Sequence, residues 1–239
     1  MKIFKKTYTT ATVLTLLFCL ILAPAVRSQV VNEVTKKKIS IGVGMFTDIW
    51  MNTPSDIKIR TINQGFNVFA LYNTPFGKSH FGFSIGLGLS AHNMYGNFLV
   101  DKFKDSTFLK PIPSSVSYKR SKITLAYLEV PVEFNFKSKS KVSVALGFKV
   151  GMLVGSNTKY VGNADSLVTN QYYIHTAGEK IRFRTWGIKN LEQFTYGPTI
   201  RVGYKWFNLT GYYMLSSVFN KTRGPELYPI SVGFVIMPF

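Results

Sequence analysis

The stretch Phe81-Gly82-Phe83-Ser84-Ile85-Gly86-Leu87-Gly88-Leu89-Ser90 decides the fold class, because large apolar side chains alternate strictly with glycine or serine. A period of two places successive side chains on opposite faces of a β-strand. The same alternation recurs over residues 142–152 and 230–236. After Gln29 the chain has no apolar run of roughly 18 residues, so it predicts an all-β protein without membrane-spanning helices.

Outward from this stretch, the alternation predicts eight strands whose connections differ regularly in length. The predicted strands are residues 38–49, 63–73, 80–91, 122–137, 141–155, 192–204, 206–217 and 228–239. Short connections follow the second, fourth and sixth strands, and all the others are long. Outer-membrane barrels have short periplasmic turns and long external loops. The sequence therefore predicts an eight-stranded antiparallel up-and-down transmembrane β-barrel with four long extracellular loops.

The two faces of the predicted strands differ in side-chain size, which indicates the face that meets lipid. Opposite the large apolar residues lie the glycines Gly42, Gly44, Gly82, Gly86, Gly88, Gly147, Gly151 and Gly203. Small residues suit the narrow interior of an eight-stranded barrel, whereas a soluble barrel would turn its charged residues outward. We therefore expect the apolar face to contact lipid.

Aromatic residues gather near both ends of the predicted strands, as in the two interfacial girdles of outer-membrane barrels. The set beside the short turns is Tyr72, Phe76, Phe81, Tyr204, Trp206 and Phe207. The set beside the long loops is Trp50, Tyr95, Phe219 and Tyr228.

The N-terminus predicts export to the cell outer membrane. Residues 1–28 combine a basic start with an apolar stretch from Ala11 to Ala25, which is typical of a cleaved secretory signal peptide. We expect residues 29–37 to form a short periplasmic segment and residues 38–239 to form the barrel. The single cysteine, Cys19, lies in the predicted signal, so disulfide and thiolate chemistry are not expected in the mature chain.

The chain is strongly basic. Removal of residues 1–28 would take away four cations and no acid, so the net charge falls from +18 to +14. A basic excess can indicate nucleic acid, but an exported chain rarely meets it. Outer-membrane lipid and lipopolysaccharide offer the same electrostatic attraction, and we expect them as partners.

One hairpin motif carries a family resemblance. Tyr127-Leu128-Glu129-Val130-Pro131-Val132, followed after a tight turn by Gly147-Phe148-Lys149-Val150-Gly151, resembles the central hairpin of Bacteroidetes outer-membrane β-barrel proteins, which include the PorT-like branch. Pro75-Phe76-Gly77-Lys78, Phe81-Gly82-Phe83-Ser84 and the C-terminal Phe239 are similar to the same family. The resemblance implies an outer-membrane β-barrel domain, and some members of the branch are linked to type IX protein secretion and gliding.

Charged residues on the predicted inner face indicate a polar network in the lumen. The alternation over residues 128–136 turns Glu129 and Glu133 inward, and Lys149 and Arg201 lie on the inner faces of their strands. Buried carboxylates need cationic partners, so we predict that these four residues form a structural network.

The apolar residues just upstream change parity. Ile123, Leu125 and Tyr127 alternate in the opposite phase to the apolar residues of the 128–136 stretch. If both sets faced lipid, an extra residue would be needed between them. The sequence therefore predicts a β-bulge near Tyr127.

Catalytic chemistry is weakly indicated. Ser90 and His92 share a face near a long loop, as a lipid A-modifying hydrolase would need, but the sequence places no acid partner beside them. An acid/base pair of Glu129 and Glu133 would lack access for a substrate. The histidines are not at metal-ligand spacing. We therefore predict no catalytic, cofactor-binding or metal-binding residues, and no enzymatic activity.

The long loops are the expected place of function. Their candidate contact residues are Lys102, Lys104, Lys180, Arg182 and Arg184. Residues 180–186 follow a turn and are predicted to pair with residues 171–175 in a projecting hairpin. Such basic loops would bind lipopolysaccharide or a partner protein, or simply lie at an anionic surface.

Together these features favour a non-enzymatic outer-membrane barrel that acts as a structural, binding or secretion-accessory component, with other envelope or secretion proteins as candidate partners. The alternative is a small porin-like channel, although side chains normally fill an eight-stranded barrel. A lipid A-modifying enzyme is the third hypothesis.

Overall fold

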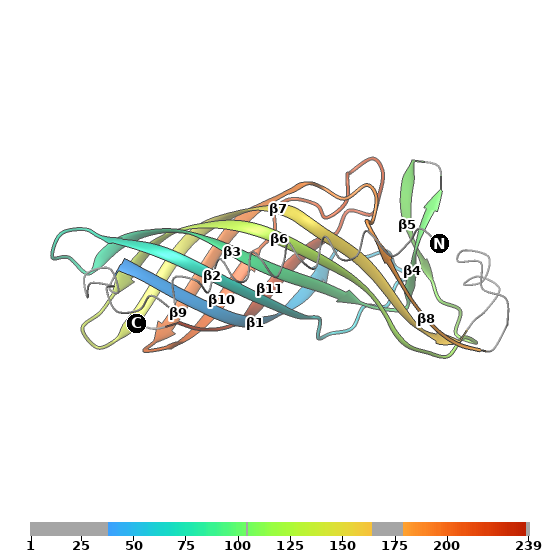
Figure 1. Cartoon of the computed structure of the whole chain (residues 1–239), viewed down its shortest axis with the longest axis horizontal. Helices are drawn as coiled ribbons and strands as arrows, with labels where there is room; N and C mark the ends of the chain where they lie inside the picture. The colour runs from blue at the N-terminus through green and yellow to red at the C-terminus, as the bar shows by residue number, and fades with distance from the viewer. Residues whose placement is uncertain (1–37, 104, 164–178, 238–239) are drawn as a thin grey trace, which may run out of the picture. The chain divides into compact units, whose positions relative to one another are not determined.

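The computed structural model describes residues 38–103, 105–163 and 179–237, and this part of the chain is built from β-strands (Figure 1). Eight strands form a barrel: β1 (Ile39–Met51), β2 (Gln64–Pro75), β3 (Phe81–Tyr95), β6 (Tyr118–Lys137), β7 (Val142–Asn163), β9 (Phe194–Tyr204), β10 (Phe207–Tyr213) and β11 (Tyr228–Ile236). The described residues contain no helix long and apolar enough to span a membrane.

The barrel closes by antiparallel pairing of every neighbouring strand. Strand β1 pairs with both β2 and β11, and the ring is completed by the pairing of β6 with β7. This confirms the predicted fold class and the predicted order of strands. Short turns connect β2 to β3, β6 to β7 and β9 to β10. Each of the three turns contains a residue with positive φ, Gly77 at 59°, Lys141 at 64° and Lys205 at 56°, which lets the chain reverse tightly.

Strands β6 and β7 continue past the ring on the side of the long loops. There β7 also pairs with β8 (Lys180–Trp186), and the three strands make an extension toward the right of Figure 1. Residues 180–186 therefore form a strand as predicted, but their partner is the end of β7 at residues 157–163. The predicted partner at residues 171–175 lies outside the described residues.

A second hairpin occupies the connection between β3 and β6. It consists of β4 (Phe98–Phe103) and β5 (Ser106–Pro111), which pair only with each other within the described residues. Much of the segment expected to be loop at residues 92–121 is thus strand.

The exterior of the ring is an apolar band. Exposed side chains on it come from every barrel strand, including Ile41, Phe66, Leu87, Val130, Leu146, Ile200, Leu209 and Val232. The predicted inner-face glycines lie on the opposite side, where space is short. A Cβ on Gly42 would lie 2.5 Å from the Phe69 ring, and one on Gly88 would lie 2.8 Å from Phe69 Cβ. The glycines therefore allow large side chains from neighbouring strands to fill the lumen.

The predicted bulge occurs at the expected level but on the other strand. In β6 the residues Ile123, Leu125, Tyr127, Glu129 and Glu133 all face inward, so its parity does not change. The register shifts because Ala126 pairs with Gly155 and Tyr127 pairs with Leu153, which leaves the extra residue in β7. A bulge near Tyr127 is therefore confirmed, but the reason for expecting it was wrong, because the upstream apolar residues face the interior and not lipid.

Pro131 lies where strand pairing is interrupted. The ladder between β3 and β6 omits the two positions between Ile85–Val132 and Gly88–Glu129. Proline has no backbone N–H to donate to a neighbouring strand. The interruption of the ladder therefore lies where Pro131 is expected to cause one.

The interior has an apolar layer on the side of the long loops. We call this cluster the apolar plug, and it comprises Trp50, Ile57, Met94, Phe98, Leu109, Ile123, Leu125, Tyr127, Tyr212, Met214, Val218, Phe219 and Leu227. Its loop residues Phe219 and Leu227 are fully buried. The aromatic girdle predicted at this end is therefore wrong for Trp50 and Phe219, which pack inside the barrel and do not face lipid.

The loops that cover the plug are tied to one another by hydrogen bonds. Near the start of β5, the Thr107 N–H donates to Arg223 O at 2.7 Å, and the Thr107 hydroxyl donates to Lys189 O at 3.1 Å. Asn190 donates to Asp105 O at 2.8 Å. Leu191 and Phe219 form an isolated β-bridge. We call these joined loops, residues 105–111 and 187–227 without their barrel strands, the cap.

Candidate functional site

Three acid–base pairs lie inside the ring below the apolar plug. We call their members, Asp48, His92, Glu129, Lys149, Glu133 and Arg201, the lumen network. All six side chains are buried. They come from β1, β3, β6, β7 and β9, so the network spans the lumen from wall to wall.

Two pairs contain the residues singled out in the sequence. Lys149 Nζ lies 2.9 Å from Glu129 Oε1, and the ammonium also sits 3.8 Å from the centre of the Tyr212 ring. Arg201 donates from Nη2 to Glu133 Oε2 and from Nη1 to Asn208 Oδ1 at 3.3 Å. The structure thus brings Glu129, Glu133, Lys149 and Arg201 together as two adjacent pairs.

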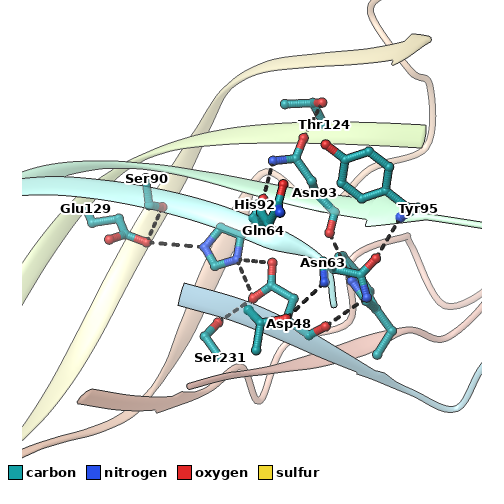
Figure 2. Close-up of polar contacts among 12 residues, drawn as sticks. Asp48, Asn63, Gln64, Ser90, His92, Asn93, Tyr95, Thr124, Glu129 and Ser231 are labelled. Carbon is teal, nitrogen blue, oxygen red and sulfur yellow. Dashed lines mark hydrogen bonds and ion pairs between the residues drawn. The ribbon is translucent and has the colours of Figure 1, made fainter. Parts of the chain in front are cut away.

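The third pair was not found in the sequence. His92 Nδ1 lies 3.1 Å from both carboxylate oxygens of Asp48, and Ser231 donates to Asp48 Oδ1 at 2.6 Å (Figure 2). Asp48 follows inward-facing Gly42, Gly44 and Phe46 in β1 with the same parity. That phase was the signal that could have placed its carboxylate in the lumen.

The contacts of Ser90 argue against a catalytic triad. Asp48 supplies the acid partner for His92 that the sequence did not place, but the Ser90 hydroxyl donates to Glu129 Oε1 at 2.7 Å (Figure 2). A nucleophilic serine must instead donate to the histidine that accepts its proton. Ser90 and His92 are also buried.

A cavity of about 60 Å³ adjoins the lumen network. Four buried polar atoms without a hydrogen-bond partner in the protein belong to residues that line it: Asn67 Oδ1, His92 Nε2, Arg201 Nε and Tyr212 Oη. A polar cavity of this size holds only a few ordered waters. This volume is far too small for a sugar or for another organic ligand of similar size.

The predicted loop contacts are found in two places. Lys102 lies in β4 opposite Thr107, and Lys104 lies outside the described residues. Lys180, Arg182 and Arg184 alternate along β8 and are exposed, whereas Ile181 and Phe183 between them are half-buried against a small apolar cluster around Tyr160. The three cations therefore share the outward face of the extension.

Neighbouring strands add further cations to that face. Lys122 pairs with Lys159, and Lys159 pairs with Arg184, so three cations form one cross-strand row. In the next row Arg120 and Arg182 flank Val161. We call Lys122, Lys159, Arg184, Arg120 and Arg182 the basic ridge. Lys122 and Lys159 were missed in the sequence because they were assigned to a strand start and a loop whose pairing was unknown.

The ridge lies beyond the apolar band, outside the membrane-spanning segments. Burial, together with the nearby cations Arg120, Lys159 and Arg184, lowers the pKa of Lys122 to about 8. Its ammonium donates to Asn93 Oδ1 at 2.7 Å and lies 5.2 Å from the centre of the Tyr95 ring. In the described part of the chain, no carboxylate pairs with a ridge cation.

Beside the ridge the surface is hollowed. The hollow has a volume of about 410 Å³ and is lined by Arg60, Thr61, Ile62, Gln64, Tyr95 and Arg120. Arg60 stacks 5.5 Å from the centre of the Tyr95 ring. We call this feature the Arg60 hollow.

Among the described residues, no group of three or more potential ligands could hold a metal ion.

Two kinds of comparison with known proteins yield matches. Solved structures similar to the chain include the attachment invasion locus protein Ail of Yersinia pestis, at 12% identity and a TM-score of 0.38, over 84% of this chain and 97% of that chain. The same protein in complex with the heparin analogue sucrose octasulfate matches at 13% identity and a TM-score of 0.36, with the same coverage. No curated protein matches.

The family comparison covers most of the chain. The model of the outer membrane protein beta-barrel domain matches residues 36–220, which include seven of the eight barrel strands. This agrees with a closed ring whose exterior is apolar. The chain therefore belongs to the outer membrane protein beta-barrel domain family.

Proposed function

We propose that this outer-membrane barrel is a non-conducting, non-enzymatic component that binds an envelope or secretion protein through its cap. The observation that carries the proposal is the apolar plug. Its fully buried Phe219 and Leu227 fill the mouth on the side of the long loops, and short periplasmic turns put that side outside the cell. Because the plug closes the mouth of the barrel, a partner outside the cell would meet the cap and not the lumen.

The ties within the cap support a binding role. Surface loops are usually mobile, but hydrogen bonds of Thr107 here join β5 to residues 189, 190 and 223. A surface that is ordered before binding loses less conformational entropy when a partner docks. The cap therefore suits recognition of another protein.

We further infer that the chain belongs to the PorT-like branch of Bacteroidetes barrels and serves as an accessory to type IX secretion. Support comes from the motif over residues 127–132, which resembles that branch and supplies Glu129 to the lumen network. Deletion of the protein is expected to reduce export of secreted proteins. Normal export in the deletion strain would contradict this assignment.

A small channel is the competing function, and planar-bilayer recording distinguishes it. The purified protein is expected to give no conductance steps, because both the plug and the charged pairs fill the lumen. Reproducible steps that disappear on boiling would establish a pore. A parallel gel with and without boiling verifies that the recorded material is the folded barrel.

Site-specific cross-linking tests the cap. The sequence has a single cysteine, Cys19, in the predicted signal, so a cysteine introduced by Lys221→Cys would carry a photo-reactive group alone in a processed chain. Lys139→Cys, in the short turn after β6, is the matched control on the opposite end. An adduct with one envelope protein at position 221 and none at 139 is expected. The reverse pattern would rule out the cap as the binding surface.

A further inference from the structure

The basic ridge is an unfavourable arrangement for the protein alone. Like charges directly opposite one another on neighbouring strands destabilise a sheet, and the row of Lys122, Lys159 and Arg184 contains two such pairs. No carboxylate in the described residues neutralises this row. An anionic ligand would turn the repulsion into attraction.

The order of residues along the extension indicates where that ligand lies. Starting from the barrel, successive cross-strand rows on the outward face are Ala91, Ala126 and Gly155, then Asn93, Thr124, Asn157 and Trp186, then Tyr95, Lys122, Lys159 and Arg184. Trp186 is well exposed in the middle row. Exposed tryptophan marks the membrane interface in such barrels. The cations begin one row further out, roughly 7 Å along the strands.

This level is that of the lipid head groups, and the ridge faces sideways toward the surrounding lipid. Its outward face continues the lipid-facing surface of β6 and β7 below, where Val130 and Val150 are exposed. A ligand held here has its acyl chains against the apolar band and its anionic head against the cations. A soluble polyanion would have no reason to prefer a site that adjoins the membrane.

The chemistry of the site matches a phosphorylated sugar. Adjacent strands lie about 4.8 Å apart, so the three cations of the main row span roughly 10 Å. Arginine binds phosphate through two parallel hydrogen bonds, and lysine adds a point charge. The adjoining Arg60 hollow is lined by two further cations, Arg60 and Arg120, and by the Tyr95 ring.

We propose that the basic ridge and the Arg60 hollow bind the phosphorylated sugar head group of a lipid A-type glycolipid in the outer leaflet. This site lies on the side of the barrel, whereas the proposed protein partner would contact the cap. Loss of one interaction therefore leaves the other measurable.

Reconstitution in nanodiscs tests the proposal. The protein is placed in phosphatidylcholine discs that also contain bisphosphorylated lipid A, fully dephosphorylated lipid A or phosphatidylglycerol. Native mass spectrometry counts the retained lipid, and the temperature of heat-modifiability on gels reports stability. The ridge variant is Lys159→Gln/Arg184→Gln. The matched control is Lys78→Gln/Lys139→Gln, which removes the same charge from two exposed residues in short turns.

We expect the parent and the control to retain bisphosphorylated lipid A and the ridge variant to lose about tenfold in affinity or more, since two charge-assisted contacts are removed. Without lipid A, the ridge variant should unfold at the same temperature as the parent or a higher one, because repulsion is relieved. A purely structural ridge predicts the opposite sign.

Three results would overturn the proposal. The first is equal retention of bisphosphorylated lipid A by the ridge variant. The second is equal retention of the dephosphorylated form or of phosphatidylglycerol by the parent, which would mean that phosphate recognition is absent or that any anionic surface suffices. The third is a ridge variant that is less stable than the control without lipid A. The ridge variant should leave two other readouts unchanged: the export of secreted proteins, and the cross-link formed from position 221 in the cap.

Discussion

The apolar plug and the lumen network are built by the same strands, yet one is apolar and the other is charged. Buried Trp50 lies two positions after buried Asp48 along β1, and Met94 lies two positions after His92 along β3. In the plug, loops contribute Val218, Phe219 and Leu227 from outside the wall. All six members of the lumen network come from barrel strands, and their charged side chains reach across the lumen to pair.

The difference teaches that the barrel interior is filled according to what can reach it. Where loops fold inward, apolar side chains meet and exclude water. Where only wall residues are available, glycines make room and paired charges bridge the gap. The two layers should therefore respond differently to substitution, and the following experiments test whether they do.

The largest effect is expected from breaking a pair in the lumen network. Arg201→Met leaves Glu133 buried without its cation, which should cost about 3–5 kcal/mol of unfolding free energy. Urea unfolding of the protein in lipid vesicles measures this. The double variant Glu133→Gln/Arg201→Met should recover most of the loss, because no unpaired charge remains.

A surface ion pair gives the scale for that measurement. Lys110→Met removes the partner of Asp101 in the β4–β5 hairpin, where the lysine side chain is half exposed. It should cost less than about 1 kcal/mol. If Arg201→Met costs no more than Lys110→Met, the lumen network does not contribute to stability as described.

In the apolar plug, truncation should act through packing alone. Leu227→Ala removes a fully buried side chain and should cost about 2–5 kcal/mol. Leu227→Met, which nearly conserves volume, should cost much less. The same vesicle unfolding assay applies. Similar losses for the alanine and methionine variants would show that this part of the interior is loosely packed.

A smaller effect is expected for the histidine that joins the two layers. His92→Gln removes the imidazole that pairs with Asp48 but leaves the Ser231 hydroxyl bonded to the Asp48 carboxylate. The expected cost is about 1–3 kcal/mol, typical of one buried polar group left short of a partner. A cost as large as that of Arg201→Met would mean that Ser231 does not compensate.

The smallest effect is expected for Lys122, a cation that pairs with no carboxylate in the described part of the chain. The pKa of Lys122 is about 8 in the folded protein and near 10.5 as a free side chain, so the unfolded state binds more protons between these values. Stability should therefore rise slightly as the pH increases from 8 toward 10.5. The variant Lys122→Gln should lack this rise, and an unchanged pH profile would contradict the lowered pKa.

The sequence predicted the ring well, because an alternation such as that of residues 81–90 is a local property of each strand. It also predicted that Glu129, Glu133, Lys149 and Arg201 face inward, since they share the phase of the glycines. Which acid meets which base depends on register, and a single sequence does not specify register. For the same reason Asp48 was not connected to His92.

The errors concern apolar residues near the long loops. Ile123 and Leu125 were assigned to lipid, and Trp50 and Phe219 to a girdle, because an apolar side chain suits a dry interior and a membrane equally well. Only the inward folding of the loops distinguishes the two. The row of Lys122, Lys159 and Arg184 could not be recognised in the sequence for a related reason. These residues become neighbours only when β6, β7 and β8 pair.

Strand β8 has one further consequence for a crowded membrane. Among the described residues it pairs with β7, beyond the closed ring. Strands that extend from a closed ring are where two copies could join into a continuous sheet. Lys180, Arg182 and Arg184 place a charge at every second position of β8. Two such strands brought side by side would repel each other, which keeps adjacent barrels from fusing through their extensions.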